Sequence, residues 1–146
     1  GAQVTRRDAS AERLALAAGV LPQARTEQVG QEARVTYDAV FDATGSIAAM
    51  NGGLDWLGHG GTYVLLSVVK GDLTFPDPEF HKRETTLLAS RNALKSDFDH
   101  VMACIRDGRV PVDRLATHST TLDQAATTLP QWAADRGALI KAIIHV

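Results

Sequence analysis

Short strand-like runs alternate with helical runs along this chain, and this alternation restricts the fold more than any other feature. Strands are predicted at 3–8, 39–43, 62–69, 85–90 and 139–146, with a weaker one at 24–29. Helices are predicted at 11–19, 47–57, 96–108 and from 121 onward. Strands joined through helices form mostly parallel sheets, because a parallel connection needs a long crossover. The sequence therefore predicts an α/β fold with a doubly wound, mostly parallel sheet.

Local signals mark the ends of these elements. Ser10 and Thr121 are suited to cap helix N-termini, and Gly19 predicts a helix end. Gly108 predicts the end of the helix that begins near residue 96, and Pro130 predicts a kink or an end in the last helix. The run at 39–43 is apolar except for one acid, which is typical of a buried parallel strand.

Composition and charge exclude several classes of protein. A chain of 146 residues with 45% hydrophobic and 22% charged residues suits one folded soluble domain. Its net charge of −2 comes from scattered charges, so nothing favours a nucleic acid or an anionic membrane as partner. No apolar run approaches the length of a membrane span. The single cysteine, Cys104, is expected to fill the core and fits a reducing compartment, so a cytoplasmic protein is expected.

One acidic residue stands where a dinucleotide-binding sheet holds its ligand. Asp8 ends the first strand, and an acid there can accept two hydrogen bonds from a ribose. A negative charge before a helix is also favoured by the helix dipole, so a structural role stays open. Arg13 is either a partner of the adenosine end or a solvated helix arginine. The glycine-rich turn that accompanies such an acid is missing.

A second candidate is the turn of Thr44, Gly45 and Ser46 after the strand at 39–43. It lies at the sheet edge where ligands bind, and its glycine permits close backbone approach. An ordinary strand-to-helix turn explains it equally well. The five histidines and Cys104 lack metal-ligand spacing, and neither Ser67 nor Ser90 lies in a nucleophile elbow. No metal ligand and no catalytic residue is therefore predicted.

In order and spacing, the segments of this chain resemble the nucleotide-binding and C-terminal part of the zinc-type medium-chain dehydrogenases that act on alcohols, polyols and sugar acids. The resemblance is carried by Gly1–Val4 with Asp8 and Arg13, and by 37–46, 60–66, 81–93 and 140–144. It implies a Rossmann-like fold and a nicotinamide cofactor. NAD is expected rather than NADP, because an acid at the ribose position repels a 2′-phosphate, although Arg6 and Arg7 precede that acid.

The resemblance also implies which residues contact the cofactor. Asp8 and Arg13 would bind the adenosine end, and Lys141 would lie near the pyrophosphate. The turn at 44–46 would border the cofactor. Residues 66–68 would line its nicotinamide side, and residues 90–92 would contact the nicotinamide ribose or the pyrophosphate. The full set is Asp8, Arg13, Thr44, Gly45, Ser46, Leu66, Ser67, Val68, Ser90, Arg91, Asn92 and Lys141.

The same resemblance implies that part of the enzyme is absent from this sequence. Residues 1–95 would form a partial dinucleotide-binding domain, and residues 96–146 would supply C-terminal helices and a closing strand that return to a catalytic domain. The family's zinc belongs to that absent domain. The glycine-rich turn is missing, together with the strand expected between those that end at Asp8 and Ala43. We therefore expect a truncated dehydrogenase, and we expect that this chain by itself does not oxidise alcohols.

Partners and rival interpretations follow from these expectations. The implied partners are a nicotinamide dinucleotide, an alcohol or polyol, and a second copy that pairs through the edge segments at 73–75 and 85–90. A Rossmann-like methyltransferase fragment also has an acid that binds a ribose after its second strand. A non-catalytic nucleotide-binding or dimerisation module is the other alternative.

Overall fold

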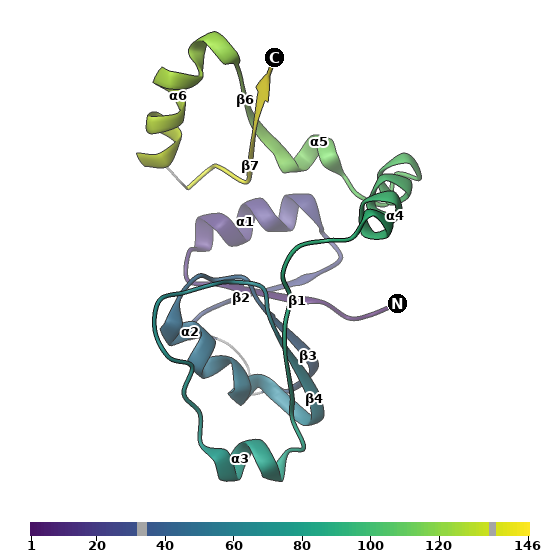
Figure 1. The fold of residues 1–146 in the computed structure, drawn as a ribbon, viewed down its shortest axis with the longest axis vertical. Helices are drawn as coiled ribbons and strands as arrows, with labels where there is room; N and C mark the ends of the chain where they lie inside the picture. Colours follow the sequence, from purple (N-terminus) through teal and green to yellow (C-terminus); the bar gives the residue numbers. More distant parts are fainter. Residues whose placement is uncertain (32–34, 135–136) are drawn as a thin grey trace. The chain divides into compact units, whose positions relative to one another are not determined.

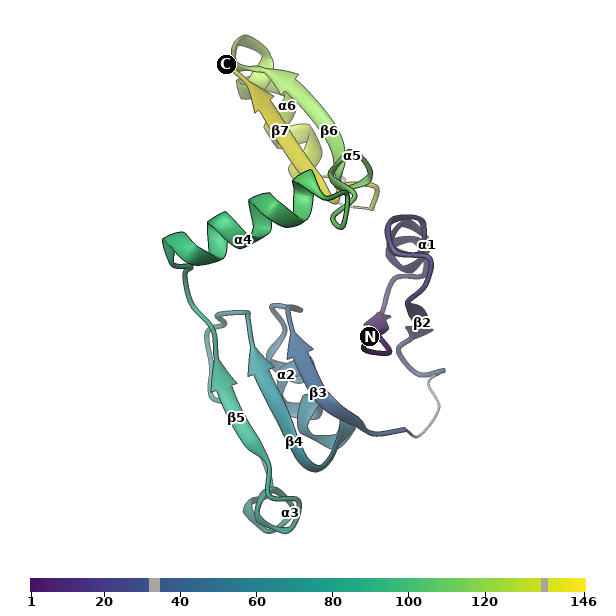
Figure 2. The ribbon, with the colours of Figure 1, turned by 90° about the vertical axis from the view of Figure 1, so that its right-hand side faces the viewer.

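The computed structural model describes residues 1–31, 35–134 and 137–146. Its helices and strands alternate along the chain, as the sequence predicts (Figures 1 and 2). In order, they are β1 (Thr5–Asp8), α1 (Ala11–Val20), β2 (Arg25–Gln28), β3 (Tyr37–Asp42), α2 (Ile47–Gly52), the 3₁₀ helix η1 (Gly53–Trp56), β4 (Leu57–Leu65), α3 (Asp77–Lys82), β5 (Thr86–Ala89), α4 (Lys95–Arg106), α5 (Val112–Leu115), β6 (Ala116–Thr121), α6 (Leu122–Ala134) and β7 (Lys141–His145).

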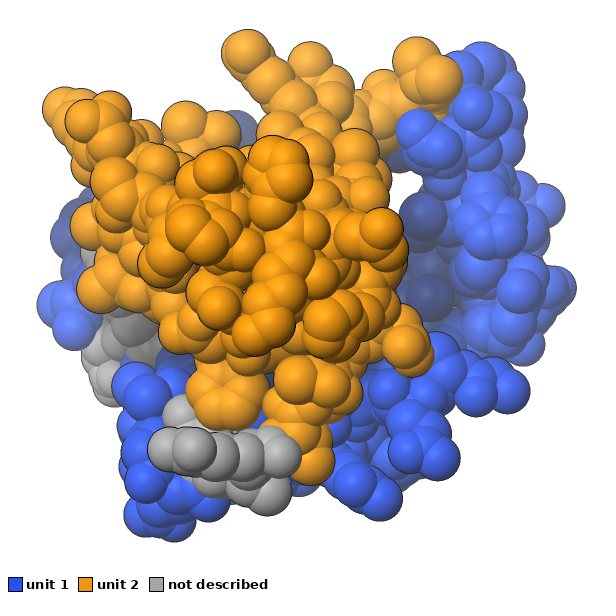
Figure 3. Space-filling model, turned by 90° about the horizontal axis from the view of Figure 1, so that it is seen from below, with its two compact units in different colours: residues 1–32, 95–146 blue, residues 33–94 orange. Residues whose placement is uncertain are grey.

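The chain divides into two compact units, coloured separately in Figure 3. Unit 1 comprises Gly1–Glu32 and Lys95–Val146, and unit 2 comprises Ala33–Leu94. Unit 1 therefore joins two stretches of sequence that flank unit 2. The functional domains expected from the sequence, 1–95 and 96–146, remain a prediction.

Every strand pairing in the described residues is parallel. The strands form a β1-β2 sheet, a β3-β4-β5 sheet and a β6-β7 sheet. The predicted mostly parallel α/β fold is confirmed, although its strands lie in three sheets rather than one. Both β1 and β3 are edge strands, with one strand partner each in the part of the chain that the structure describes.

Helix α1 begins as predicted and ends later than predicted. The Ser10 hydroxyl accepts a hydrogen bond from the Arg13 N–H at 3.2 Å, which confirms the N-cap. Gly19 does not end the helix, which continues through Val20. The Arg6 guanidinium on β1 donates hydrogen bonds to the carbonyl oxygens of Ala17 and Leu21. Because these bonds satisfy carbonyls of the last turn, the helix needs no glycine there.

The C-terminal helices of unit 1 differ from expectation in their packing. Gly108 ends α4 with a φ of +69°, as predicted. Cys104 is only half-buried, so its predicted role as core filler is wrong; its sulfur lies 3.6 Å from His100 Nε2. Pro130 lies inside α6 and does not end it, while Thr128 of this helix lies 3.3 Å from Thr120 of β6, hydroxyl to hydroxyl. Packing of α6 on β6 offsets the loss of the backbone hydrogen bond that a proline cannot donate.

In unit 2, the expected boundary between helix and strand shifts toward the N-terminus. The helix predicted at 47–57 is observed as α2, which η1 continues to Trp56, while the strand predicted at 62–69 begins earlier and runs from Leu57 to Leu65. Tyr37 pairs with Leu57 but Ala39 pairs with Thr62, so the glycine-rich stretch lies in an irregularity of β4. Glycines permit that distortion instead of ending the helix, and Gly60 adopts a φ of +71° there.

Burial on β3 also differs from the prediction. Phe41 exposes 65% of its surface, so β3 is not buried on both faces. Asp42, the acid that interrupts the apolar run, is buried. The side chain of Phe41 lies on the face of the sheet opposite to that of Tyr63, which belongs to the neighbouring strand and faces α2 and η1. The weaker strand at β2 and the strand at β5 are confirmed.

The core of unit 2 centres on Tyr63, whose side chain is fully buried. Its hydroxyl donates a hydrogen bond of 2.9 Å to the Met50 carbonyl in α2. A Cβ added to Gly53 would overlap the Tyr63 phenol ring. Burial, followed by the nearby Asp42 carboxylate, raises the pKa of Tyr63 from 10.0 to about 12.

The buried Tyr63 makes unit 2 less stable in alkali. Because the folded pKa lies above the unfolded one, the stabilisation is fully present below pH 10 and falls as the pH rises toward 12. Linkage gives a loss of about 1.4 kcal/mol between pH 8 and pH 11 from this residue. We expect Tyr63→Phe to lose about 1 kcal/mol at pH 8 with its hydrogen bond, but to lack this alkaline loss.

Urea unfolding of both proteins at pH 8 and pH 11 measures this effect. The difference in unfolding free energy between Tyr63→Phe and the unmodified chain should shrink or change sign at pH 11. A constant difference would show that Tyr63 ionises as readily in the folded chain as in the unfolded one.

Candidate functional site

The Asp8 carboxylate lies at the carboxyl end of β1 and is half-exposed. Its Oδ1 accepts a hydrogen bond of 2.8 Å from the Ser10 N–H, and its Oδ2 lies 3.8 Å from Arg13 Nε. The side chains of Asp8 and Arg13 keep 40% and 45% of their surface exposed. The structure therefore brings these two predicted residues together and leaves both accessible to a ligand.

The two arginines before Asp8 make contacts inside unit 1. Arg7 donates from Nε and Nη2 to Glu27 Oε2 on β2, at 3.0 and 2.7 Å. Arg6 donates to the last turn of α1, to Leu21 O at 2.9 Å and to Ala17 O. Both guanidinium groups therefore have protein acceptors, which weakens the case that they bind a phosphate.

A cleft of about 340 Å³ adjoins Asp8 and Arg13 within unit 1. Its polar rim comes from the end of β1, and its apolar wall comes from α1 with Leu115 of α5 and Ile140. Pockets of this size with an apolar wall and a few polar groups are typical of small-molecule sites. Lys141 follows Ile140 at the start of β7, but it does not line this cleft.

In unit 2, the turn of Thr44, Gly45 and Ser46 is held by buried Asp42. The Asp42 carboxylate accepts hydrogen bonds from the Thr44 N–H at 3.1 Å and from the Thr44 hydroxyl at 3.1 and 3.2 Å. The Ser46 N–H donates to the Thr44 hydroxyl at 3.2 Å, and the Ser46 hydroxyl caps α2 through Ala49. Gly45 adopts a φ of +66°, where a side chain would be strained.

The next strand along the sheet supports the same turn. Ser67 follows β4, and its hydroxyl accepts a hydrogen bond of 3.0 Å from the Gly45 N–H. The Leu66 N–H donates to the Asp42 carbonyl, and the Ser90 N–H donates to the Leu65 carbonyl, both at 2.9 Å. The structure therefore brings Thr44, Gly45, Ser46, Leu66, Ser67 and Ser90 to the carboxyl edge of one parallel sheet.

The remaining predicted residues of unit 2 are exposed beyond the strands. Val68 is almost fully exposed, while Arg91 and Asn92 follow β5 at the surface. Asn92 has a φ of +63°, a conformation that asparagine tolerates better than most residues. The predicted cofactor contacts of these residues stay predictions.

Asp42 is the residue that the sequence interpretation missed. In the sequence it interrupts an apolar strand, yet the residue is only 5% exposed and organises the turn. The available signal was its spacing, because an Asp two residues before a Thr favours a side-chain turn of this type. Buried acids at the end of a strand with such a partner are therefore candidates for positioning a ligand-facing loop.

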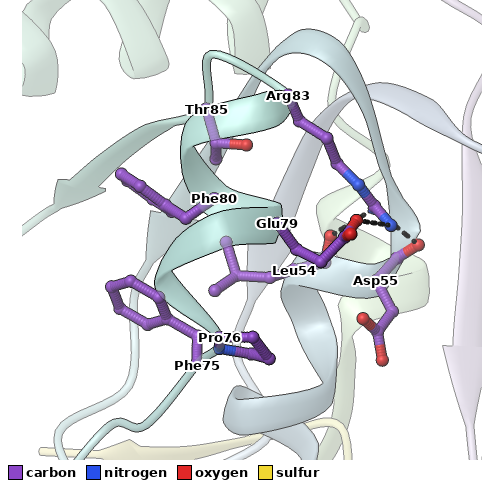
Figure 4. A pocket seen from close by; sticks show the side chains of 8 residues that line it. All are labelled: Leu54, Asp55, Phe75, Pro76, Glu79, Phe80, Arg83 and Thr85. Atoms are coloured by element: carbon purple, nitrogen blue, oxygen red, sulfur yellow. Dashed lines mark hydrogen bonds and ion pairs between the residues drawn. The ribbon is translucent and has the colours of Figure 1, made fainter.

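Unit 2 contains a hollow between α3 and η1, and the residues around it hold these two elements together (Figure 4). Arg83 reaches from the end of α3 to η1 and lies within 3.2–3.4 Å of the carbonyls of Leu54, Asp55 and Leu57. Its guanidinium also lies 3.5 Å from Glu79, while Phe75 stacks on Phe80 with ring centroids 4.8 Å apart. Although Arg83 belongs to the charged run at 81–84, its guanidinium binds α3 to η1.

Across residues 1–31, 35–134 and 137–146, no group of three or more His, Cys, Asp or Glu side chains could hold a metal ion. The residues described here therefore do not fit a catalytic zinc. None of the helices in these ranges is long and apolar enough to span a membrane.

Comparisons with known proteins relate the chain to dehydrogenases. No protein-family model matches it. It is 41% identical over 105 residues to the L-galactonate-5-dehydrogenase of Escherichia coli K12, covering 72% of this chain and 31% of that protein. The chain thus spans about a third of the length of this relative.

Solved structures with low sequence identity share the fold. A 2R,3R-butanediol dehydrogenase from Bacillus subtilis matches with a TM-score of 0.87 and 15% identity over 99% of this chain and 44% of its own. An alcohol dehydrogenase from Escherichia coli CFT073, complexed with cofactor NADH, matches with a TM-score of 0.85 and 16% identity over 96% of this chain and 43% of its own.

Proposed function

We propose that this chain forms the nicotinamide-binding and C-terminal part of a zinc-type medium-chain alcohol or polyol dehydrogenase, supported by its similarity to the E. coli L-galactonate-5-dehydrogenase and by the fold it shares with solved dehydrogenases. The observation that carries the proposal is the half-exposed Asp8 carboxylate beside Arg13 at the mouth of an apolar cleft. A carboxylate at the end of the second strand of a dinucleotide fold binds the ribose hydroxyls. The cleft wall formed by α1 would accept the adenine ring.

NAD is the better fit for this site. The Asp8 carboxylate would repel a 2′-phosphate, and Arg6 and Arg7 already donate to acceptors of the protein. Thr44, Gly45, Ser46 and Ser67 would border the cofactor at the edge of the unit 2 sheet. The roles of the remaining residues follow from the resemblance between the order of elements in this chain and that in the dehydrogenases. These residues are Leu66, Val68, Ser90, Arg91, Asn92 and Lys141.

The cofactor supplies a hydride acceptor, and the role of this chain is to bind and orient it. The substrate class, a secondary alcohol, polyol or sugar acid, follows from the relatives and belongs to the complete enzyme. Zinc does not fit the described residues, so no step through a metal is assigned to them. We assign residues 1–95 to cofactor binding. We assign residues 96–146 to the C-terminal helices and closing strand through which the polypeptide returns to a catalytic domain.

Two further proposals concern the state of the protein in the cell. Among the described residues, one edge of β5 has no strand partner, and such an edge suits pairing with a second copy because it presents backbone donors and acceptors. A reducing, cytoplasmic location agrees with a lone half-buried Cys104.

Calorimetric titration of the chain with NADH and with S-adenosylmethionine tests the proposed function. We expect NADH to bind at least tenfold more tightly than the methyl donor, because Asp8 and its cleft suit a dinucleotide ribose and a solved structure of the same fold carries NADH. Tighter binding of the methyl donor would favour a methyltransferase fragment. If neither compound bound, a non-catalytic dimerisation module would be favoured.

An activity assay supplies the matched control. With NAD and a panel of polyols, this chain should give no turnover above a protein-free blank, because the described residues hold no metal cluster. Measurable turnover would contradict the division of labour proposed between this chain and an absent catalytic domain.

A further inference from the structure

The cleft beside Asp8 carries more positive than negative charge. Three guanidinium groups line it together with a single carboxylate; the arginines are Arg6, Arg7 and Arg13, and the carboxylate is that of Asp8. In dinucleotide-binding folds, an arginine near this position accommodates the 2′-phosphate of NADP. The composition of the rim thus suits a 2′-phosphate as well as a ribose, so selection of NAD depends on what already holds each arginine.

Two of the three arginines are held by groups of the cleft itself. Arg6 donates hydrogen bonds to the carbonyl oxygens of Ala17 and Leu21 at the end of α1. Arg13 Nε lies 3.8 Å from Asp8 Oδ2, and both side chains are half-exposed. These two guanidinium groups therefore support the wall and the carboxylate that the proposed cofactor would meet.

Arg7 is held from outside the cleft. Its Nε and Nη2 donate to Glu27 Oε2 at 3.0 and 2.7 Å. The two residues are register partners on β1 and β2, so their side chains lie on the same face of this sheet. Only 18% and 20% of these side chains is exposed, which shields the ion pair from the water and salt that weaken surface pairs. Glu27 itself does not line the cleft.

The place of Arg7 makes this ion pair relevant to the choice of cofactor. Arg7 directly precedes Asp8 and lines the same cleft. An arginine binds a phosphate most strongly with two N–H donors side by side. Two such donors of Arg7, on Nε and Nη2, are directed at Glu27 instead. Glu27 therefore both neutralises this guanidinium and occupies the donors that a phosphate would need.

We propose that Glu27 determines cofactor specificity: by holding Arg7 in an ion pair, it keeps the cleft selective for a nicotinamide dinucleotide without a 2′-phosphate. The inference rests on the proposed function, because that function assigns the adenosine end of the cofactor to this cleft. Asp8 opposes a 2′-phosphate through its own charge. Glu27 opposes it by engaging the cation that would offset this charge, so it is a positioning residue that acts through Arg7.

Titration of cofactors into Glu27→Gln tests this proposal. Glutamine keeps the length of the side chain and removes its charge. We expect the NADPH affinity to rise at least tenfold and the NADH affinity to change less than threefold, because a phosphate is a stronger acceptor for arginine than a neutral amide. Adenosine 2′,5′-bisphosphate should gain over adenosine 5′-phosphate by a similar factor, because these two probes differ only in the 2′-phosphate.

Glu12→Gln is the matched control for the loss of one negative charge. Glu12 lies in the first turn of α1 and, like Glu27, does not line the cleft. This variant should change the ratio of NADPH to NADH affinity less than threefold. An equal gain for NADPH in both variants would overturn the proposal, because the net charge of the chain would then explain it.

Removal of Arg7 separates the charge of Glu27 from its action through the arginine. Arg7→Gln alone should change the NADPH affinity less than threefold, because Glu27 already engages that guanidinium. Adding Arg7→Gln to Glu27→Gln should abolish the gain for NADPH. Such a cycle isolates the coupling between two residues in contact. A gain that survives without Arg7 would overturn the proposal, because Glu27 would then repel the phosphate directly.

The outcomes distinguish this inference from the proposed function. An unmodified chain that binds NADH, with an unchanged preference in Glu27→Gln, refutes the role of Glu27 alone. An unmodified chain that binds neither NADH nor adenosine 5′-phosphate refutes the proposed function, and the role of Glu27 with it. A purely structural ion pair would weaken both cofactors in parallel and leave their ratio unchanged. If circular dichroism shows that Glu27→Gln does not fold, Glu27→Thr, which suits a strand, replaces it with the same outcomes.

Discussion

Asp8→Asn is expected to weaken NADH binding about thirtyfold and to bring the NADPH affinity within about threefold of it. Asparagine keeps an oxygen for the Ser10 N–H, so the start of α1 is preserved. It loses the negative charge that strengthens hydrogen bonds from the ribose, worth about 1.5–3 kcal/mol for a charged acceptor. It also removes the repulsion of a 2′-phosphate, so NADPH should gain affinity as NADH loses it.

Fluorescence titration of both cofactors measures the change, with Glu12→Gln as the matched control. Glu12 lies in the first turn of α1 and does not line the cleft, so the control removes the same charge close by. Glu12→Gln should change the NADH affinity less than threefold. An NADH-to-NADPH preference that is equal in Asp8→Asn and the unmodified chain would refute the ribose role and leave Asp8 as a helix-terminal charge.

Gly53→Ala is expected to lower the free energy of unfolding of unit 2 by about 3 kcal/mol, the upper range for forcing a methyl group into a packed core. The added Cβ would overlap the phenol of Tyr63, and its distance to Tyr63 Cε2 would be 2.9 Å. The phenol cannot withdraw without losing its hydrogen bond to the Met50 carbonyl. Backbone strain plays no part, because Gly53 has an ordinary helical φ of −64°.

Gly52→Ala is the matched control for that substitution. A Cβ at Gly52 meets no atom within 4 Å, and the residue is also helical. Alanine there should raise the stability by about 0.5–1 kcal/mol, because it restricts the unfolded chain more than glycine does. Urea unfolding followed by tryptophan fluorescence gives both values. Equal stabilities of the two variants would contradict the packing described around Tyr63.

Much of the fold was accessible from periodicity and end signals, and the exceptions have local causes. The predicted strands fall on β1 to β5 and β7, and the Ser10 cap is present. Helix α3 was missed because Pro76 and Pro78 suggest a loop, yet prolines fit the first turn of a helix. Strand β6 was missed because its threonine-rich sequence lacks apolar alternation; it is defined by pairing with β7.

The site was predictable where a residue acts through its place on a strand, and unpredictable where it acts through a partner. The place of Asp8 at the end of β1 is confirmed, because the end of a strand is visible in the sequence, while its role at a ribose stays a prediction. The role of Asp42 depends on its burial and on the Thr44 hydroxyl, and neither follows from periodicity. The role of Ser67 on the nicotinamide side stays a prediction. Its hydroxyl also accepts a hydrogen bond from the Gly45 N–H, a contact between residues that lie 22 positions apart and that periodicity does not predict.

Unit 1 is built from two separate stretches of sequence, and this affects the order in which the two units can fold during synthesis on the ribosome. Unit 2 is one uninterrupted stretch, so its sheet can close once β5 has left the exit tunnel. Unit 1 needs a stretch translated before unit 2 and another translated after it; Arg114 on α5, for example, donates to the Gly19 carbonyl at 3.0 Å. The first stretch must therefore wait through the synthesis of the whole of unit 2 before unit 1 can close.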